Sequence, residues 1–297
     1  MNLGRSINEI FKFSLIDFLK NKELKKYLIF LTIIYVIFFV CYIMTTGFYY
    51  NFVANQITNY VQVISDFTLL IIIISIPLGL VITFFEYKII EELLKAKKQK
   101  NAKIDFIRYV KFLFMPLIMT LYAALSLFKI KFLLIGIIAV LLVIIGTIIS
   151  LANILLGIIV LLLGLLTGLI YFAIFIYQFI RLSMAQVALV EGRGLINALE
   201  ESWKVTKNNV LNIIVVGIVF FIIIYIITMI FTIPSIIYSI AYSFTLAIES
   251  QTEMMSSVLL FDPMYNLLML PIYLIAGYIL IVQTNVITLL YLILKKK

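Results

Sequence analysis

The chain has 297 residues, of which 65% are hydrophobic and only 12% are charged, and its formal net charge is +9. A soluble domain has roughly 45–50% apolar and about 25% charged residues, so this composition excludes an aqueous globular fold and indicates a protein whose solvent is lipid. The chain has no histidine and a single cysteine, which excludes an internal disulfide and removes the commonest metal ligand.

The apolar residues occur in long unbroken runs, and this pattern predicts the fold class. Backbone groups inside a bilayer must bond to each other, which leaves helices or a closed barrel, and unbroken runs favour helices. We therefore predict an all-α, polytopic helical bundle that forms a single integral membrane domain over residues 1–297, with about six transmembrane helices and additional amphipathic interfacial helices. The predicted spans are residues 27–50, 67–85, 132–150, 155–180, 210–231 and 267–292.

Charged segments lie between the spans. Residues 5–21 place apolar side chains at helical spacing among charged ones, which predicts a helix in the headgroup layer; an ordinary cytosolic surface helix is the alternative. Residues 86–111 predict a hairpin of two amphipathic helices, broken near residues 99–102. It carries eight Lys and Arg side chains at 88–111. These either bind anionic lipid headgroups or only mark the cytosolic side of the membrane. Because positive charge gathers at helix ends, we expect no nucleic-acid partner.

The topology depends on residues 112–180, which contain three apolar runs. If all three cross, the polar segment 181–208 faces outward; if two cross, it faces inward. Residues 233–265 contain no Lys or Arg and the chain ends in three lysines, which favours an outer 233–265 and a cytosolic C-terminus. We therefore predict that 112–128 is a re-entrant or partial helix; the alternative is that 112–128 crosses and 132–150 folds back.

We therefore expect a multi-pass protein of the cytoplasmic membrane with both termini cytosolic. We expect the fifth span to end at Pro234, because proline interrupts helices. Residues 233–265 then lie on the outer interface.

The longest polar passage in the second half of the chain is residues 181–208, which follows 49 residues without a charged side chain. Gly192 and Gly194 predict a break in the helix that leaves the membrane. Residues 197–203 predict a short helix. We expect its apolar side to carry Leu195, Ile196, Leu199 and Trp203, and its wet side to carry Glu200 and Ser202.

The order of residue types in this passage is Arg, an Ala-rich turn, Glu-Gly-x-Gly, Ala-Leu, Ser-Trp and Lys-x-Asn. It resembles a superfamily of six-span prokaryotic membrane proteins that includes the membrane domain attached to some glycerophosphoryl diester phosphodiesterases. The matching positions are Arg181, Ala185, Glu191, Gly192, Gly194, Ala198, Leu199, Ser202, Trp203 and Lys207. The resemblance implies a six-span membrane fold and no specific chemistry.

The passage has two interpretations. It is either a structural turn with a helix docked under the bundle, or a docking element at 194–208 for a cytosolic partner. No nucleophile–base constellation, cofactor motif or mid-span ionisable residue occurs, so we expect no enzyme activity, cofactor or metal site. We expect a non-enzymatic scaffold, regulator or membrane-homeostasis factor in the lipid bilayer. The alternative is a passive permease or the membrane subunit of a multi-component transporter.

Overall fold

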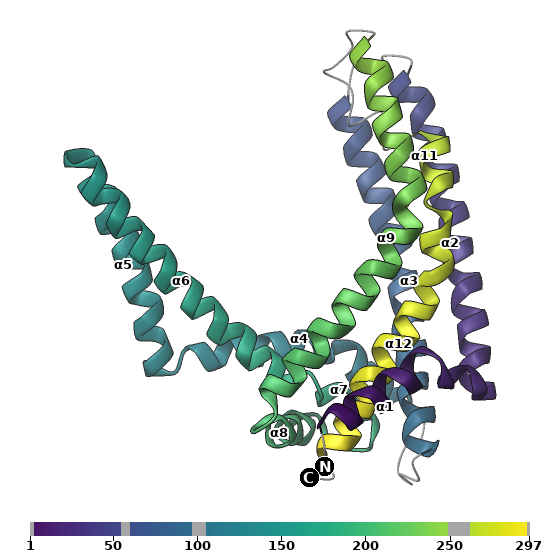
Figure 1. Ribbon diagram of the computed structural model, residues 1–297, viewed down its shortest axis with the longest axis horizontal. Helices are drawn as coiled ribbons and strands as arrows, with labels where there is room; N and C mark the ends of the chain where they lie inside the picture. The colour runs from purple at the N-terminus through teal and green to yellow at the C-terminus, as the bar shows by residue number, and fades with distance from the viewer. Residues whose placement is uncertain (1–2, 55–59, 97–104, 249–261, 296–297) are drawn as a thin grey trace. The chain divides into compact units, whose positions relative to one another are not determined.

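A computed structural model of the chain describes residues 3–54, 60–96, 105–248 and 262–295, and the regular secondary structure of these residues is helical, as predicted (Figure 1). The elements are α1 (Leu3–Leu15), η1 (Asp17–Lys20), α2 (Lys22–Ala54), α3 (Tyr60–Ala96), α4 (Phe106–Leu127), α5 (Ile130–Ala152), α6 (Ile154–Leu182), α7 (Ala185–Val190), α8 (Leu195–Thr206), α9 (Val210–Ile248), α11 (Pro263–Leu268) and α12 (Leu270–Lys295). Seven helical segments of the described residues are long and apolar enough to cross a membrane.

The chain forms two compact units. The first unit comprises residues 1–98 and 216–289, and it therefore holds α1 to α3, α11 and most of α9 and α12. The second unit comprises residues 99–215 and 290–297, and it holds α4 to α8 with the start of α9 and the end of α12.

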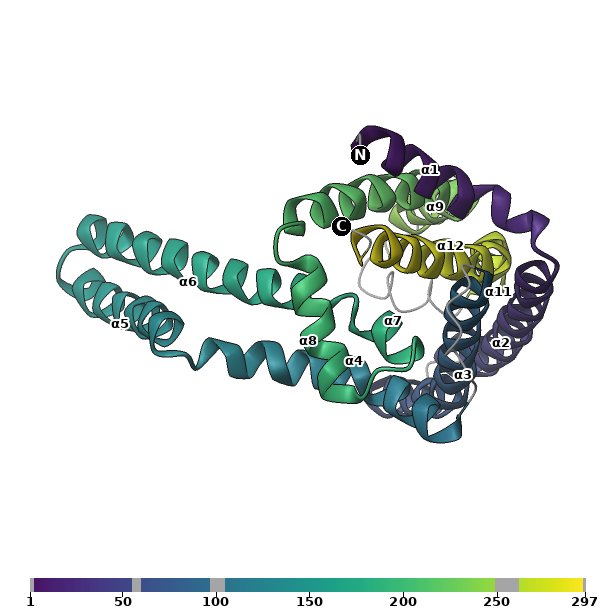
Figure 2. The same cartoon turned by 90° about the horizontal axis from the view of Figure 1, so that it is seen from below.

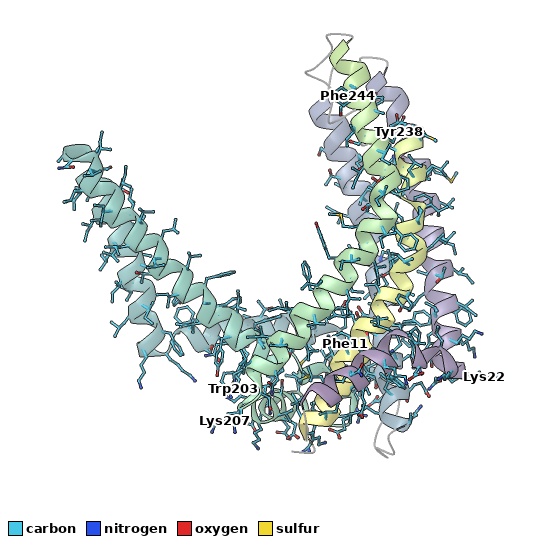
Figure 3. All side chains as sticks on the ribbon, viewed as in Figure 1. Phe11, Lys22, Trp203, Lys207, Tyr238 and Phe244 are labelled. Atoms are coloured by element: carbon cyan, nitrogen blue, oxygen red, sulfur yellow. The ribbon has the colours of Figure 1, made fainter. Side chains whose placement is uncertain are left out.

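In the first unit, α2 and α12 run antiparallel. A Cβ atom added at Gly277 would lie 3.0 Å from the Leu31 Cβ atom, and the rings of Phe39 and Tyr273 lie 4.9 Å apart. Residue numbers therefore rise along α2 as they fall along α12, which puts α11 near the far end of α2. Figure 3 shows Lys22 and Tyr238 at opposite ends of this unit.

The predicted amphipathic helix at residues 5–21 is confirmed as α1 and η1, with a break at Ile16. Its inner face contains Ile10, Phe11 and Phe18, which are buried. The Tyr278 hydroxyl donates a 2.8 Å hydrogen bond to the carbonyl of Leu15. The carboxyl end of α1 is therefore attached to α12 through Tyr278.

In the second unit, α5 and α6 form a long antiparallel hairpin that both views show side by side (Figures 1 and 2). Asn153 ends α5 and caps α6, because its side-chain oxygen accepts a 3.1 Å hydrogen bond from the Leu156 N–H. Glycines bring the two backbones close: a Cβ atom at Gly157 would lie only 2.4 Å from the Ser150 Cα atom. Gly136 faces Tyr171 at the other end, so the start of α5 and the last turns of α6 form the foot of the hairpin.

At this foot, α4 turns away from the hairpin instead of continuing beside α5 (Figures 1 and 2). It contacts α6 and α7. Its buried residues recur every three or four positions: Phe112, Met115, Met119, Ala123, Ser126 and Leu127. The stretch 112–128, predicted as re-entrant or partial, is therefore part of one continuous helix that begins at Phe106. It is also among the seven segments able to cross, and its path through the bilayer stays a prediction.

Five of the six predicted spans fall within single helices, but the predicted end of the fifth was wrong. α9 does not end at Pro234 and continues to Ile248. Hydroxyls of the adjoining turns donate to preceding carbonyls, Thr232 to Met229 and Ser235 to Thr232, and an internal proline is tolerated in membrane helices. The last predicted span is divided at Met269 into α11 and α12.

The two amphipathic helices predicted at 86–111 are present as parts of longer helices. Residues 86–96 continue α3 without a break, because no glycine or proline interrupts this stretch of good helix formers. Residues 106–111 are the first turns of α4. The predicted break at 99–102 lies outside the described residues.

Candidate functional site

The turn predicted at Gly192 and Gly194 follows the end of α7 and contains a residue with positive φ. α7 stops at Val190, and Gly192 adopts a φ of 118°, a conformation that residues with a side chain rarely adopt. The Gly192 N–H donates to the Leu189 carbonyl (3.1 Å) and the Arg193 N–H to the Ala188 carbonyl (3.2 Å), the paired bonds of a Schellman motif. Gly194 is extended, with a φ of −66°, and precedes α8. The predicted helix break is therefore confirmed, and Gly192 is the residue that requires glycine.

The inner face of α8 is partly polar. Its buried residues are Ala198, Leu199, Ser202 and Thr206. The Ser202 hydroxyl donates to the Arg181 carbonyl (2.8 Å) and accepts from the Met184 N–H (3.1 Å), so it bridges the end of α6 and the start of α7. The Thr206 hydroxyl lies 3.0 Å from the same carbonyl.

Two predicted orientations on α8 were therefore wrong. Ser202 was expected on the wet side but is fully buried, and Ile196 was expected on the apolar side but is 69% exposed. The reason is that the carbonyl and N–H groups at the end of α6 need partners, and the hydroxyls of α8 supply them. Sequence reasoning missed Thr206, which the i, i+4 spacing from Ser202 could have indicated.

We expect Ser202→Ala to lower the free energy of unfolding by about 2 kcal/mol, because the buried Met184 N–H loses the acceptor that it has among the described residues. Denaturation of the purified protein in mixed detergent micelles measures this change. Ser183→Ala is the matched control, since the Ser183 hydroxyl bonds only within its own helix end, to the Ile180 carbonyl. Equal losses for the two variants would contradict the bridging role of Ser202.

Arg181 joins α6 to α8 through an aromatic stack. Its guanidinium carbon lies 3.8 Å from the centroid of the Trp203 ring and 5.9 Å from that of Tyr177. One guanidinium N–H donates a 3.1 Å hydrogen bond to the Trp203 carbonyl. Arg181 is 9% exposed and forms no ion pair with any carboxylate of the described residues. Stacking on desolvated rings is therefore the main compensation for burying this charge.

Trp203 also contacts Tyr122 of α4, with ring centroids 6.2 Å apart in an edge-to-face arrangement. Figure 3 shows Trp203 and Lys207 at the end of the second unit where the hairpin has its foot. Three helices (α4, α6 and α8) thus meet at one indole ring.

Glu191 is held by the end of α12. Its carboxylate accepts a 2.6 Å hydrogen bond from the Tyr291 hydroxyl and pairs with the Lys295 ammonium. Arg193 and Glu201, 3.7 Å apart, form a more exposed ion pair across the same turn. Sequence reasoning missed Tyr291 and Lys295, because no local signal connects residues about a hundred positions apart.

The outward face of α8 is available for contact. Ile196, Glu200, Lys204 and Lys207 are exposed, and none of these charged side chains forms an ion pair among the described residues. The inner face of the helix, by contrast, is fixed by the bonds of Ser202 and Thr206. The predicted site residues therefore divide into a buried set that positions α8 and an outward set that includes Lys207.

The basic stretch at 88–111 is less cationic than its sequence indicates. Lys88 and Lys95 lie 3.5 and 2.9 Å from the buried Glu91 carboxylate, and Lys95 also pairs with Glu92. Residues 97–104, which hold four of the eight basic side chains, lie outside the described residues. In the described ranges, no three acidic or cysteine side chains form a group that could hold a metal ion.

Comparison with known proteins gives one result. Residues 111–294 match the model of a protein family described as a domain of unknown function, DUF7847. This match covers well over half of the chain and includes every residue of the candidate site up to Tyr291. No curated protein and no solved structure matches the chain.

Proposed function

The chain belongs to the DUF7847 family, a domain of unknown function, and from the geometry of its site we propose that it is a non-enzymatic scaffold, regulator or membrane-homeostasis factor. It is a multi-pass protein of the cytoplasmic membrane, and the outward face of α8 docks a cytosolic partner. The single observation that carries this proposal is that α8 is clamped on its inner face while its outward charges are unpaired.

The pairing inside the second unit supports one cytosolic boundary for that unit. The contact between Glu191 and Lys295 puts the carboxyl end of α12 beside the α7–α8 turn. The antiparallel hairpin puts Lys129 and Lys131 at the same level as the end of α6. These cations would lie at one surface of the bilayer, as the positive-inside rule expects.

The acidic end of the first unit supports the opposite boundary. Asp262 caps α11 by accepting hydrogen bonds from the Met264 and Tyr265 N–H groups, and it also accepts a 2.9 Å bond from the Tyr238 hydroxyl. α11 packs near the end of α2 that is remote from Lys22. On the proposed topology this end faces outward, with both termini in the cytosol and six spans.

The resemblance to the superfamily that includes the glycerophosphoryl diester phosphodiesterase membrane domain is part of this proposal. It rests on the order of residues in the motif, of which Arg181, Gly192 and Ser202 each have a distinct role in holding the turn of this chain. The resemblance adds to the proposal that members of this superfamily and this chain present a helix at the cytosolic surface in the same way.

The proposal is tested by incorporating a photocrosslinking amino acid at Ile196 in cells. We expect a crosslinked partner that is absent when the same amino acid replaces Leu211, a residue of similar exposure at the start of α9. Glu200→Lys reverses an outward charge and should remove the product, because like charges across an interface repel.

The identity of the crosslinked protein separates the two proposed roles. An ATPase subunit would favour the transporter alternative, in which α8 is a coupling helix, whereas a partner without ATPase activity would favour the scaffold. A product that survives Glu200→Lys, or equal products from Ile196 and Leu211, would refute docking through this face.

A further inference from the structure

The α5–α6 hairpin carries an open apolar groove of about 460 Å³, a volume within the roughly 300–1,000 Å³ of typical ligand sites. Residues of both helices line it, including Ala139, Val143, Gly164 and Gly168. Small or missing side chains create this groove between two otherwise bulky helices. All of its lining residues are apolar or glycine, so its occupant must offer apolar surface.

The two glycines of the groove have different roles. A Cβ atom at Gly164 would lie 2.9 Å from the Val143 Cγ2 atom and 3.0 Å from its backbone nitrogen, so Gly164 is required for the contact between α5 and α6. A Cβ atom at Gly168 would meet no atom within 4 Å. Gly168 therefore leaves space that the hairpin itself does not use.

Positive charge lies at the foot of the same hairpin. Lys129 and Lys131 are exposed, and neither forms an ion pair among the described residues. Ala139, at the near end of the groove, is ten residues from Lys129, or about 15 Å along α5. One leaflet of a bilayer has a hydrocarbon depth of about 15 Å, half of the full core.

We propose that the groove binds an acyl chain of an anionic phospholipid, whose phosphate is held by Lys129 and Lys131. The apolar lining fits the end of the chain, and the two ammonium groups without ion pairs fit the phosphate. The near end of the groove, about 15 Å along α5 from Lys129, lies at the depth to which an acyl chain crosses one leaflet. This inference rests on the membrane placement of the proposed function but is independent of partner docking at α8, so the two can fail separately.

A second copy of the chain is the competing occupant. Gly164 and Gly168 have the spacing through which membrane helices pack closely. However, Gly164 is already covered by Val143 within the hairpin, so only Gly168 is open to another helix. Two copies paired through this face would also bring their Lys129 and Lys131 side chains together, and like charges repel. The lipid is therefore the favoured occupant.

Native mass spectrometry of the whole protein tests the proposal, with phosphatidylglycerol and phosphatidylcholine of identical acyl chains as probes. Each lysine at the membrane surface contributes about 1 kcal/mol to binding an anionic lipid. We therefore expect a preference for phosphatidylglycerol of about thirtyfold, which corresponds to about 2 kcal/mol. The double substitution Lys129→Gln and Lys131→Gln should abolish this preference. The matched control, Lys204→Gln with Lys207→Gln, removes two exposed charges from α8 and should leave it unchanged.

The groove is tested by Gly168→Leu, which fills the open space without a backbone clash. We expect retention of both lipids to fall at least several-fold, with a melting temperature that does not decrease. Gly79→Leu is the control, since a Cβ atom there also meets nothing within 4 Å and Gly79, on α3, does not line the groove. Equal losses for both leucine variants, no preference in the unmodified protein, or a dimer that Gly168→Leu dissociates without changing lipid retention would each overturn the proposal.

Discussion

Arg181→Met is expected to lower the free energy of unfolding by about 3 kcal/mol, the combined worth of a desolvated cation–π stack and a charge-assisted hydrogen bond. The guanidinium lies 3.8 Å from the Trp203 ring and bonds to the Trp203 carbonyl, so methionine would lose both contacts. Arg181→Lys should also be destabilising, because an ammonium group cannot stack as a flat guanidinium does. Denaturation in mixed detergent micelles measures both losses.

A double-mutant cycle with Trp203→Leu isolates the stack, since that substitution keeps the backbone carbonyl that accepts the hydrogen bond. We expect a coupling free energy of about 1–2 kcal/mol between the two side chains. Arg193→Met is the control: Arg193 is 46% exposed in a 3.7 Å ion pair with Glu201, and such pairs contribute less than about 1 kcal/mol. Additive losses in the cycle would show that Arg181 is held by something other than the indole.

Alanine substitution at two glycines of α6 should change the stability of the protein in opposite directions. Gly157→Ala is expected to destabilise the hairpin by about 1–3 kcal/mol or more, because its Cβ atom would lie 2.4 Å from the Ser150 Cα atom and the backbones must separate. Gly168→Ala is expected to stabilise α6 by up to about 1 kcal/mol, because alanine has the higher helix propensity and meets no neighbour.

The melting temperatures of the two variants in the same detergent measure this difference. The pair controls for chemistry, since each substitution adds one methyl group to α6. A stabilising Gly157→Ala would mean that the tip of the hairpin is not closely packed.

The long helices could be predicted from the sequence because lipid imposes one solution on unbroken apolar runs. Their ends could not. Pro234 predicted a helix end by the rules of soluble proteins, whereas α9 continues past it to Ile248. Residues 86–111 predicted a hairpin of two amphipathic helices, and its first helix is the continuation of α3, because a change in polarity does not by itself break a helix.

The candidate site was predictable where the signal is local. Gly192 indicated a turn, and its positive φ confirms it. The orientation of Ser202 was not predictable from polarity, because the hydroxyl serves backbone groups of a preceding helix instead of water. The groove beside Gly168 depends on which glycines face the partner helix, and one sequence read alone does not contain that information.

The Glu191 carboxylate has a consequence for the order in which this protein is assembled. Its partners, Tyr291 and Lys295, are about a hundred residues further along the chain, so they are translated long after it. Until α12 leaves the ribosome, the Glu191 carboxylate lacks both the hydroxyl and the ammonium group that compensate for its removal from water. Docking of the end of α12 against the α7–α8 turn is therefore a late event of biogenesis, and a nascent chain interrupted before Tyr291 holds the Glu191 carboxylate without these two partners.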